Sequence, residues 1–211
     1  MSQSSDVVIV GGGVIGGALA WSLAKLGASV TLVEAGRIGR GASWASAGVL
    51  SPDWSGEDPT ALTTLAEDGM SLWPDWAREL EERSGAGLNL RRDGLLNIWV
   101  EPDAPHLPAD LATAPPAALR GEALSAAEVR ALEPSLTGPI AGGMLYPGDF
   151  QVDNTRLAPA LIRAAVDLGA RVFTETPVAA LMGTAGRCTG VRTIGGLTMG
   201  AGAVVLAAAT D

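Results

Sequence analysis

The 211-residue sequence has few of the residues that build disulfide frameworks, metal centres and polyanion-binding surfaces. Cys188 is its one cysteine, which excludes an internal disulfide framework and a cysteine metal cluster, so we expect no metal. Lysine and arginine number 14 against 23 acidic residues, a net charge of −9 that argues against a nucleic-acid partner. Residues 1–5 lack the basic and apolar regions of a secretory signal, which predicts a cytoplasmic protein.

Two further scarcities bear on function. The one histidine, His106, lies in EPDAPHLPAD, which is typical of an exposed loop, so we predict no catalytic role for it. Residues 7–24 carry no charge and are long enough for a membrane helix. They include five glycines and begin like a strand, so we interpret them as buried core.

A dinucleotide-binding pattern opens the chain. A β-branched run at residues 6–10 is typical of a buried parallel strand, and Gly11, Gly13 and Gly16 follow it in GxGxxG spacing. The first glycine permits a tight turn, the second lets the backbone approach a pyrophosphate, and the third lets the next helix pack closely. A helix expected over residues 14–26 then directs its free N–H groups and positive dipole end at the phosphates.

An acidic residue follows at the distance that a ribose contact requires. Gly27 is predicted to end the helix, and residues 29–34 form a second strand ending in Glu34, which would accept hydrogen bonds from an adenosine ribose. A carboxylate there would repel a 2′-phosphate, which disfavours NADP. The alternative is that the glycines only allow close strand–helix packing. The strand, helix and acid in the expected order favour the nucleotide site.

A second small-residue segment, GRGASWASAGVLSP, follows the acid. It contains Gly39, Gly41, Ser43 and Gly48, where a plain NAD domain needs only an ordinary connection. Small residues with exposed N–H groups would let the backbone wrap the second phosphate and reach the edge of a flavin.

The first fifty or so residues resemble the FAD-dependent amine and D-amino acid oxidase family, in the run VVIVGGGVIGGALAWSLAKLGASVTLVEAGRIGRGASWASAGVLSP. Within that family, the run is most similar to the glycine oxidase group of thiamine biosynthesis. The resemblance continues through RRDGLLNIWV, LEPSLTGPIAGGMLYPGDFQVDNTRLAPALIRAAVDLGARVFTETPV and GAVVLAAAT. It covers essentially the whole chain, with its specific motifs in the first fifty or so residues.

The resemblance implies an α/β fold, a Rossmann-like FAD-binding domain with an inserted α+β substrate domain. Residues 1–52 and 151–211 would be the two parts of the FAD-binding domain, and residues 53–150 a partial substrate or cap domain. The family continues beyond the position that matches Asp211, so we expect a C-terminally truncated chain. The missing half would supply an arginine for the substrate carboxylate, an aromatic gate and the last flavin loop.

The same resemblance places the flavin contacts residue by residue. They are Gly11, Gly13, Val14, Ile15, Gly16, Glu34, Ala35, Gly41, Ala42, Ser43, Ala47, Gly48, Val49 and Val178. Family members often have a Thr-Ser or Ser-Ser pair where this chain has Ala42-Ser43. Some relatives attach flavin covalently through a histidine near this loop, but here residues 44–46 are Trp, Ala and Ser, so we expect non-covalent FAD.

The implied reaction is oxidation of a small amino acid or amine. Hydride passes to flavin N5 to give an imino acid, and molecular oxygen or another electron acceptor reoxidises the flavin, with hydrogen peroxide as the product from oxygen. A substrate amine bound neutral needs no general base, so we predict no catalytic side chain. D-amino acid dehydrogenase, a sarcosine oxidase-like enzyme and a non-catalytic flavin-binding module remain alternatives. We also expect a homo-oligomer.

The rest of the chain is predicted to contain helices and short strands. Helical spacing spans residues 60–83, with Pro74 marking a kink or a second start. Residues 88–100 are interpreted as a hairpin around Asp93-Gly94, whose apolar residues would favour association. Ser125 and Glu128 form a capping box. Further elements are expected at residues 140–152 (strand and turn), 153–169 (helix) and 171–174, 178–182, 190–194 and 203–208 (strands).

Overall fold

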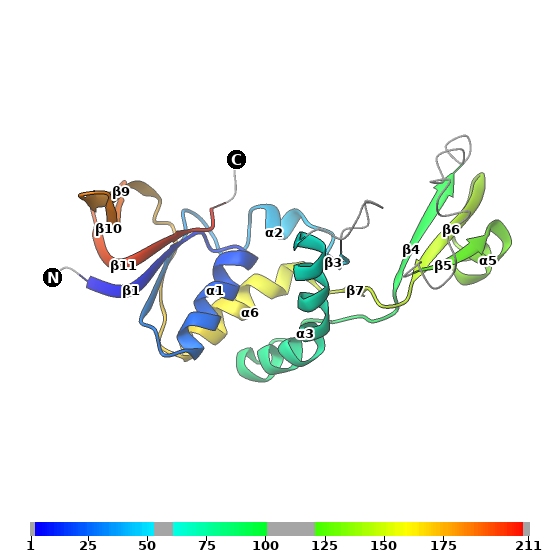
Figure 1. Cartoon of the computed structure of the whole chain (residues 1–211), viewed down its shortest axis with the longest axis horizontal. Helices are drawn as coiled ribbons and strands as arrows, with labels where there is room; N and C mark the ends of the chain where they lie inside the picture. Colours follow the sequence, from blue (N-terminus) through cyan, green and yellow to red (C-terminus); the bar gives the residue numbers. More distant parts are fainter. Residues whose placement is uncertain (1–2, 53–60, 101–120, 209–211) are drawn as a thin grey trace. The chain divides into compact units, whose positions relative to one another are not determined.

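The computed structural model describes residues 3–52, 61–100 and 121–208 (Figure 1). The chain divides into two compact units. The first comprises residues 1–48, 71–89 and 152–211, and the second comprises residues 49–70 and 90–151.

A six-stranded sheet in the order β8-β2-β1-β11-β10-β9 forms the centre of the first unit. The first four strands pair in parallel, β10 pairs antiparallel to β11, and β9 pairs antiparallel to β10. The strands are β1 (Gln3–Val10), β2 (Val30–Val33), β8 (Arg171–Phe173), β9 (Val178–Thr184), β10 (Arg187–Thr193) and β11 (Thr198–Leu206). All four residues of β2 are buried, as expected for a parallel strand covered on both faces.

Two helices pack together beside this sheet, α1 (Val14–Lys25) and α6 (Asn154–Asp167) (Figure 1). A Cβ built on Gly17 of α1 would lie 3.0 Å from the Cβ of Leu161 on α6, so the small residue lets the helices approach closely. Gly27 and Gly169 follow the two helices with φ angles of 85° and 96°, which matches their predicted role as stop residues. The helices predicted over residues 14–26 and 153–169 are both confirmed.

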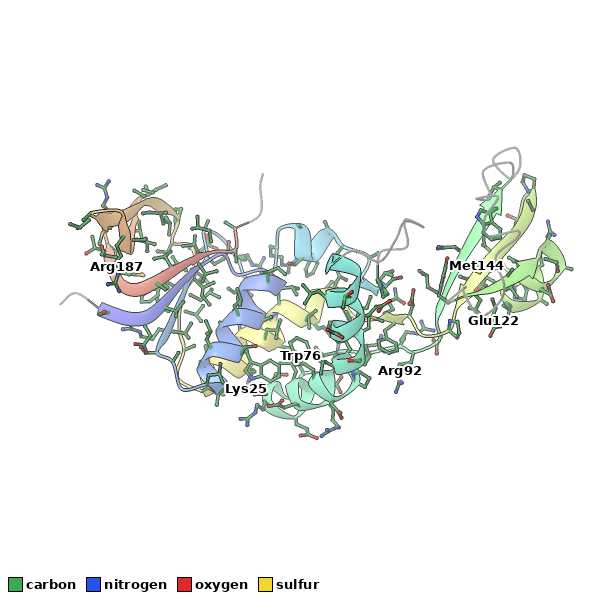
Figure 2. All side chains as sticks on the ribbon, viewed as in Figure 1. Lys25, Trp76, Arg92, Glu122, Met144 and Arg187 are labelled. Carbon is green, nitrogen blue, oxygen red and sulfur yellow. The ribbon has the colours of Figure 1, made fainter. Side chains whose placement is uncertain are left out.

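Helix α3 (Ala61–Ser84) is one continuous helix with Pro74 inside it, so no second helix starts there. Its C-terminal half packs on α1. The rings of Trp21 and Trp76 lie 5.2 Å apart, and Lys25 Nζ lies 2.6 Å from a carboxylate oxygen of Glu79. Figure 2 shows Lys25 and Trp76 between the two helices. Leu80 is fully buried.

The second unit contains a three-stranded antiparallel sheet in the order β4-β6-β5. Its strands are β4 (Leu95–Val100), β5 (Glu122–Ser125) and β6 (Ile140–Tyr146). Helix α5 (Ala126–Leu132) follows β5 and begins at the predicted capping box. Two residues of β3 (Val49–Leu50) pair with β7 (Phe150–Gln151).

The predicted hairpin in residues 88–100 is wrong. Residues 95–100 form β4, but they pair with β6 from much later in the chain, and Arg91 makes only an isolated bridge to Gln151. Gly142 and Gly143 of β6 explain the outcome, because a Cβ at either position would lie within 3 Å of a carbonyl oxygen on a neighbouring strand. These glycines let β4 and β5 approach β6 from both sides, so β6 is the central strand of the sheet. The pairing of β4 with β6 replaces the predicted turn at Asp93-Gly94.

Within residues 3–52, 61–100 and 121–208, no helix is long and apolar enough to cross a membrane. The same ranges contain no group of three or more histidine, cysteine, aspartate or glutamate side chains placed to hold a metal ion. His106 lies outside the described residues.

Candidate functional site

The glycine turn after β1 has a backbone that only glycine accommodates at two of its positions. Gly11 has a φ of 114°, and a Cβ there would lie 2.5 Å from the carbonyl oxygen of Ala207 in the segment after β11. A Cβ at Gly16 would lie 1.9 Å from the carbonyl oxygen of Gly11. The turn therefore passes tightly between β1, the end of β11 and the start of α1, as the sequence pattern predicts.

The side chain of Glu34 reaches this turn from the end of β2. One carboxylate oxygen accepts a hydrogen bond from Gly12 N–H at 2.6 Å, and the other accepts one from Gly36 N–H at 2.8 Å. The Glu34 carbonyl oxygen also accepts from Thr176 N–H at 2.9 Å. Each carboxylate oxygen has a second lone pair, so Glu34 is held in place while it can accept further hydrogen bonds, as a ribose contact requires.

The second small-residue segment contains a single helical turn, α2 (Ala42–Ala45), where the sequence predicted only a loop. The Ser43 hydroxyl oxygen accepts a hydrogen bond from Val14 N–H, the first residue of α1, at 3.0 Å. Gly13 caps α1 without a side chain, and the first turn of the helix has no acidic residue. The Ser43 hydroxyl therefore lies at the positive, N-terminal end of α1, where anions bind.

Contacts with α6 hold this segment on the first unit. Asn154 Nδ2 donates to the carbonyl oxygens of Ser43 at 3.0 Å and Trp44 at 2.7 Å. Gly48 has a φ of 72°, and its carbonyl oxygen accepts from Val152 N–H at 2.9 Å, just before α6. Gly39 N–H donates to the Gly12 carbonyl oxygen at 2.9 Å, which ties the segment to the glycine turn.

Charged groups around the segment are mostly exposed. The guanidinium of Arg40 lies 3.5 Å from the ring centroid of Trp44, a cation–π contact on the surface of α2. Asp153 caps α6 through a bond to Thr155 N–H. The hydroxyl of Thr155 also donates to this carboxylate, and these hydrogen bonds hold its pKa below the ordinary value.

The structure thus brings together Gly11–Gly16, Glu34 and Ser43. Ile15, Ala35, Gly41, Ala42 and Ala47 are exposed around them. Val178 is half-buried against the sheet core of Val8, Val33, Val191 and Met199. Val49 belongs to β3 in the second unit.

Sequence reasoning missed two participants. Gly12 supplies the N–H that binds Glu34, and Asn154 supplies the amide that binds the carbonyls of α2. The sequence placed Asn154 only within the helix expected at residues 153–169, because a sequence carries no signal for a contact between residues more than a hundred positions apart.

The described residues fit a dinucleotide. A glycine turn without Cβ atoms, a helix N-terminus and a carboxylate at the end of the second strand are the three parts that hold pyrophosphate and ribose. The hydroxyl of Ser43 adds a fourth group at the phosphate end.

Comparison with known proteins identifies the family. The model of the FAD dependent oxidoreductase family, DAO, matches residues 6–210. The glycine oxidase of Geobacillus kaustophilus is 36% identical over 192 residues, which cover 84% of this chain and 48% of that protein. The glycine oxidase of Pseudomonas putida is 31% identical over 210 residues, or 98% of this chain and 55% of that protein. The chain spans about half the length of these curated relatives.

Solved structures with a similar fold agree with this family assignment. The crystal structure of the Geobacillus kaustophilus glycine oxidase superposes with a TM-score of 0.86 at 35% identity, covering 98% of this chain and 56% of that one. The L-proline dehydrogenase of P. horikoshii shares the fold at a TM-score of 0.77 and 21% identity. The structural likenesses confirm the α/β fold predicted from the sequence, and the family model confirms the FAD-dependent class. The chain belongs to the DAO family of FAD-dependent oxidoreductases.

Proposed function

We propose that this chain binds FAD non-covalently through the glycine turn, Glu34 and the α2 segment. The observation that supports this most is the hydrogen bond from Val14 N–H to Ser43 Oγ. It places a neutral hydroxyl at the N-terminus of α1, beside the glycine turn, where a pyrophosphate is stabilised by backbone N–H groups and the helix dipole. Ser43 Oγ keeps its own hydrogen, which it can donate to a phosphate oxygen.

The adenosine end of the cofactor would lie at Glu34. Its two oxygens are fixed by the N–H groups of Gly12 and Gly36, so their remaining lone pairs point in set directions. Ala35 is exposed and small, which leaves space beside the carboxylate. Val178 follows a segment whose Thr176 N–H bonds to the Glu34 carbonyl, which supports its assignment to the adenine side.

We further infer that residues 1–52 and 151–211 form the flavin domain and residues 53–150 a substrate domain. The two compact units differ from this division in that residues 71–89 belong to the first unit and residues 49–52 and 151 to the second. The division is supported by the six-stranded sheet, which takes its strands only from the two outer segments. The smaller sheet β4-β6-β5 takes its strands only from the middle segment.

The whole protein is proposed to oxidise a small amino acid, as a glycine oxidase does. Bound FAD supplies a two-electron acceptor for oxidation of an amine to an imine. The residues of this chain would bind and orient that cofactor: α1 and Ser43 at the pyrophosphate, Glu34 at the ribose, and Gly48 toward the flavin ring. We assign no general base, because a neutral substrate amine needs none.

A first experiment tests the cofactor. The purified chain is titrated with FAD and, separately, with NAD and NADP, and binding is followed by flavin fluorescence and calorimetry. Preference for FAD, with all of the flavin released by acid precipitation, supports the proposal. Binding of NAD in preference to FAD would contradict the cofactor assignment, and flavin retained by the precipitate would contradict non-covalent attachment.

A second experiment tests the reaction. We expect the chain alone to produce no peroxide with glycine and oxygen. A fusion of this chain to the C-terminal half of the Geobacillus kaustophilus glycine oxidase should restore peroxide formation. Assaying the fusion with glycine, sarcosine and D-alanine, with oxygen or a dye as acceptor, separates an oxidase from a dehydrogenase. A fusion that binds FAD but oxidises none of these amines would favour a non-catalytic flavin-binding module.

A further inference from the structure

Helix α2 makes its main contacts through polar groups. It has four residues, and none of them is buried. An isolated helical turn of this length is not stable in water, because nucleating a helix costs more than its few hydrogen bonds return. The position of Ser43 at the start of α1 therefore depends on hydrogen bonds that reach α2 from elsewhere.

Asn154 supplies two of these bonds. It is the first residue of α6, and its Nδ2 lies 3.0 Å from the Ser43 carbonyl oxygen and 2.7 Å from the Trp44 carbonyl oxygen. Both partners are acceptors, so only the NH₂ end of the amide can serve them, and the orientation of the side chain is fixed by chemistry. The Ser46 hydroxyl also donates to the Ser43 carbonyl, at 3.1 Å.

The base of Asn154 is itself fixed. Asp153, immediately before it, caps α6 and donates its own N–H to the Leu88 carbonyl oxygen at 2.9 Å. Val152 N–H bonds to the Gly48 carbonyl at 2.9 Å, and buried Leu157 and Ala158 anchor the next turn. The Asn154 amide thus extends from a fixed helix start to α2, none of whose residues is buried.

We propose that Asn154 is a positioning residue for the phosphate end of the cofactor site, acting through Ser43. Asn154 holds the backbone of α2 so that the Ser43 hydroxyl stays on the N-terminus of α1, poised for a pyrophosphate oxygen. The inference rests on the proposed flavin site and extends it to a residue outside the family's flavin contacts assigned above.

The test compares FAD binding by wild type, Asn154→Ala, Asn154→Asp and Thr155→Ala. Thr155 is a matched control, because its hydroxyl lies one residue further along α6 and bonds to Asp153 Oδ1, not to α2. Asn154→Ala removes two hydrogen bonds, so we expect FAD affinity to fall about tenfold, as about 1.4 kcal/mol would give. The FAD affinity of Asn154→Asp should fall further, because a carboxylate beside two carbonyl oxygens and a phosphate is repelled by all three.

The readout that separates positioning from general stability is the melting temperature with and without FAD. The Asn154 variants should melt somewhat below wild type without FAD, because both hydrogen bonds are present in the free chain, and should also lose most of the FAD-dependent rise. Thr155→Ala should lower the melting temperature without FAD and keep that rise. Wild-type affinity retained in Asn154→Ala overturns the inference, and so does an equal loss in Thr155→Ala. Failure of the wild-type chain to bind FAD would instead contradict the proposed function.

Discussion

The hydroxyl oxygen of Ser43 lies 3.0 Å from the backbone nitrogen of Val14, which joins the second small-residue segment to the first turn of α1. The two residues are 29 positions apart, and β2 and the Glu34 turn lie between them in the sequence. One hydroxyl thus connects the two segments that carry the dinucleotide pattern. Because the hydroxyl oxygen accepts from Val14 N–H, its own hydrogen remains available to donate to an anion at the helix N-terminus.

Replacing Ser43 by alanine should weaken FAD binding about tenfold or more, since a hydrogen bond to a charged group contributes on the order of 1.5–3 kcal/mol. Flavin fluorescence titration measures the change. Ser135→Ala is the control, because that hydroxyl bonds to Glu133 in the second unit. Equal affinities for Ser43→Ala and wild type would remove Ser43 from the site.

Gly11→Ala should destabilise the fold strongly. The φ of 114° strains any L-residue by about 1–3 kcal/mol. A Cβ 2.5 Å from the Ala207 carbonyl oxygen adds overpacking of about 1–3 kcal/mol. Urea unfolding should show a loss of about 2–6 kcal/mol in the free energy of unfolding.

Gly69→Ala is the matched control for this substitution. Gly69 lies inside α3, and a Cβ there would meet nothing within 4 Å. Alanine should therefore raise stability by up to about 1 kcal/mol. If both substitutions changed the urea midpoint in the same direction, the steric account of the glycine turn would be wrong.

The first fifty residues show how much of this molecule the sequence predicts. Hydrophobic runs, glycine spacing and one acid predicted β1, α1, β2 and the place of Glu34, because each of these features is local. The capping box at Ser125 and the helix that starts at Asn154 were predicted for the same reason. The family resemblance added the fold and FAD, which local patterns alone do not distinguish from other dinucleotide sites.

Long-range contacts account for what the sequence did not predict. The DG pair at 93–94 is a strong local turn signal, yet residues 95–100 pair with β6, since Gly142 and Gly143 admit neighbours on both sides. The helical turn α2 is held by Asn154, more than a hundred residues later. In both cases the deciding contact joins distant segments, so a window of sequence contains no trace of it.

Replacing Glu34 by glutamine should weaken both the turn and FAD binding. The carboxylate accepts from two backbone N–H groups, one on each oxygen. An amide offers one acceptor oxygen, so its NH₂ group would face either Gly12 N–H or Gly36 N–H and leave a donor unsatisfied, at a cost of about 1–3 kcal/mol. Calorimetric titration with FAD and urea unfolding measure the two effects. Asp167→Asn, an exposed change at the end of α6, should alter neither.

Stability should fall below about pH 4 partly because of Asp6. Its carboxylate accepts from the hydroxyl and the N–H of Ser29, and these bonds lower its pKa from the ordinary 3.8. A carboxyl whose pKa is depressed in the folded state stabilises the fold above its unfolded pKa, and that stabilisation disappears as pH falls through the folded pKa. Ser29→Ala should flatten the decline in unfolding free energy below about pH 4. An identical pH profile in the variant would contradict the assignment.

Strand β4 should promote association of the chain. It pairs with β6 on one side only, and in the described sheet its other edge is free. Ile98 is 36% exposed and Val100 40% exposed along this edge strand, and an exposed apolar edge favours pairing with another chain.

Val100→Lys places a charge on this edge, so light scattering should show a lower mass at high concentration than for wild type. Glu122→Lys on β5 is the control, because it changes charge without removing apolar surface. If wild type remains a monomer at all concentrations, or if Glu122→Lys lowers the mass as much as Val100→Lys, the β4 edge is not the associating surface.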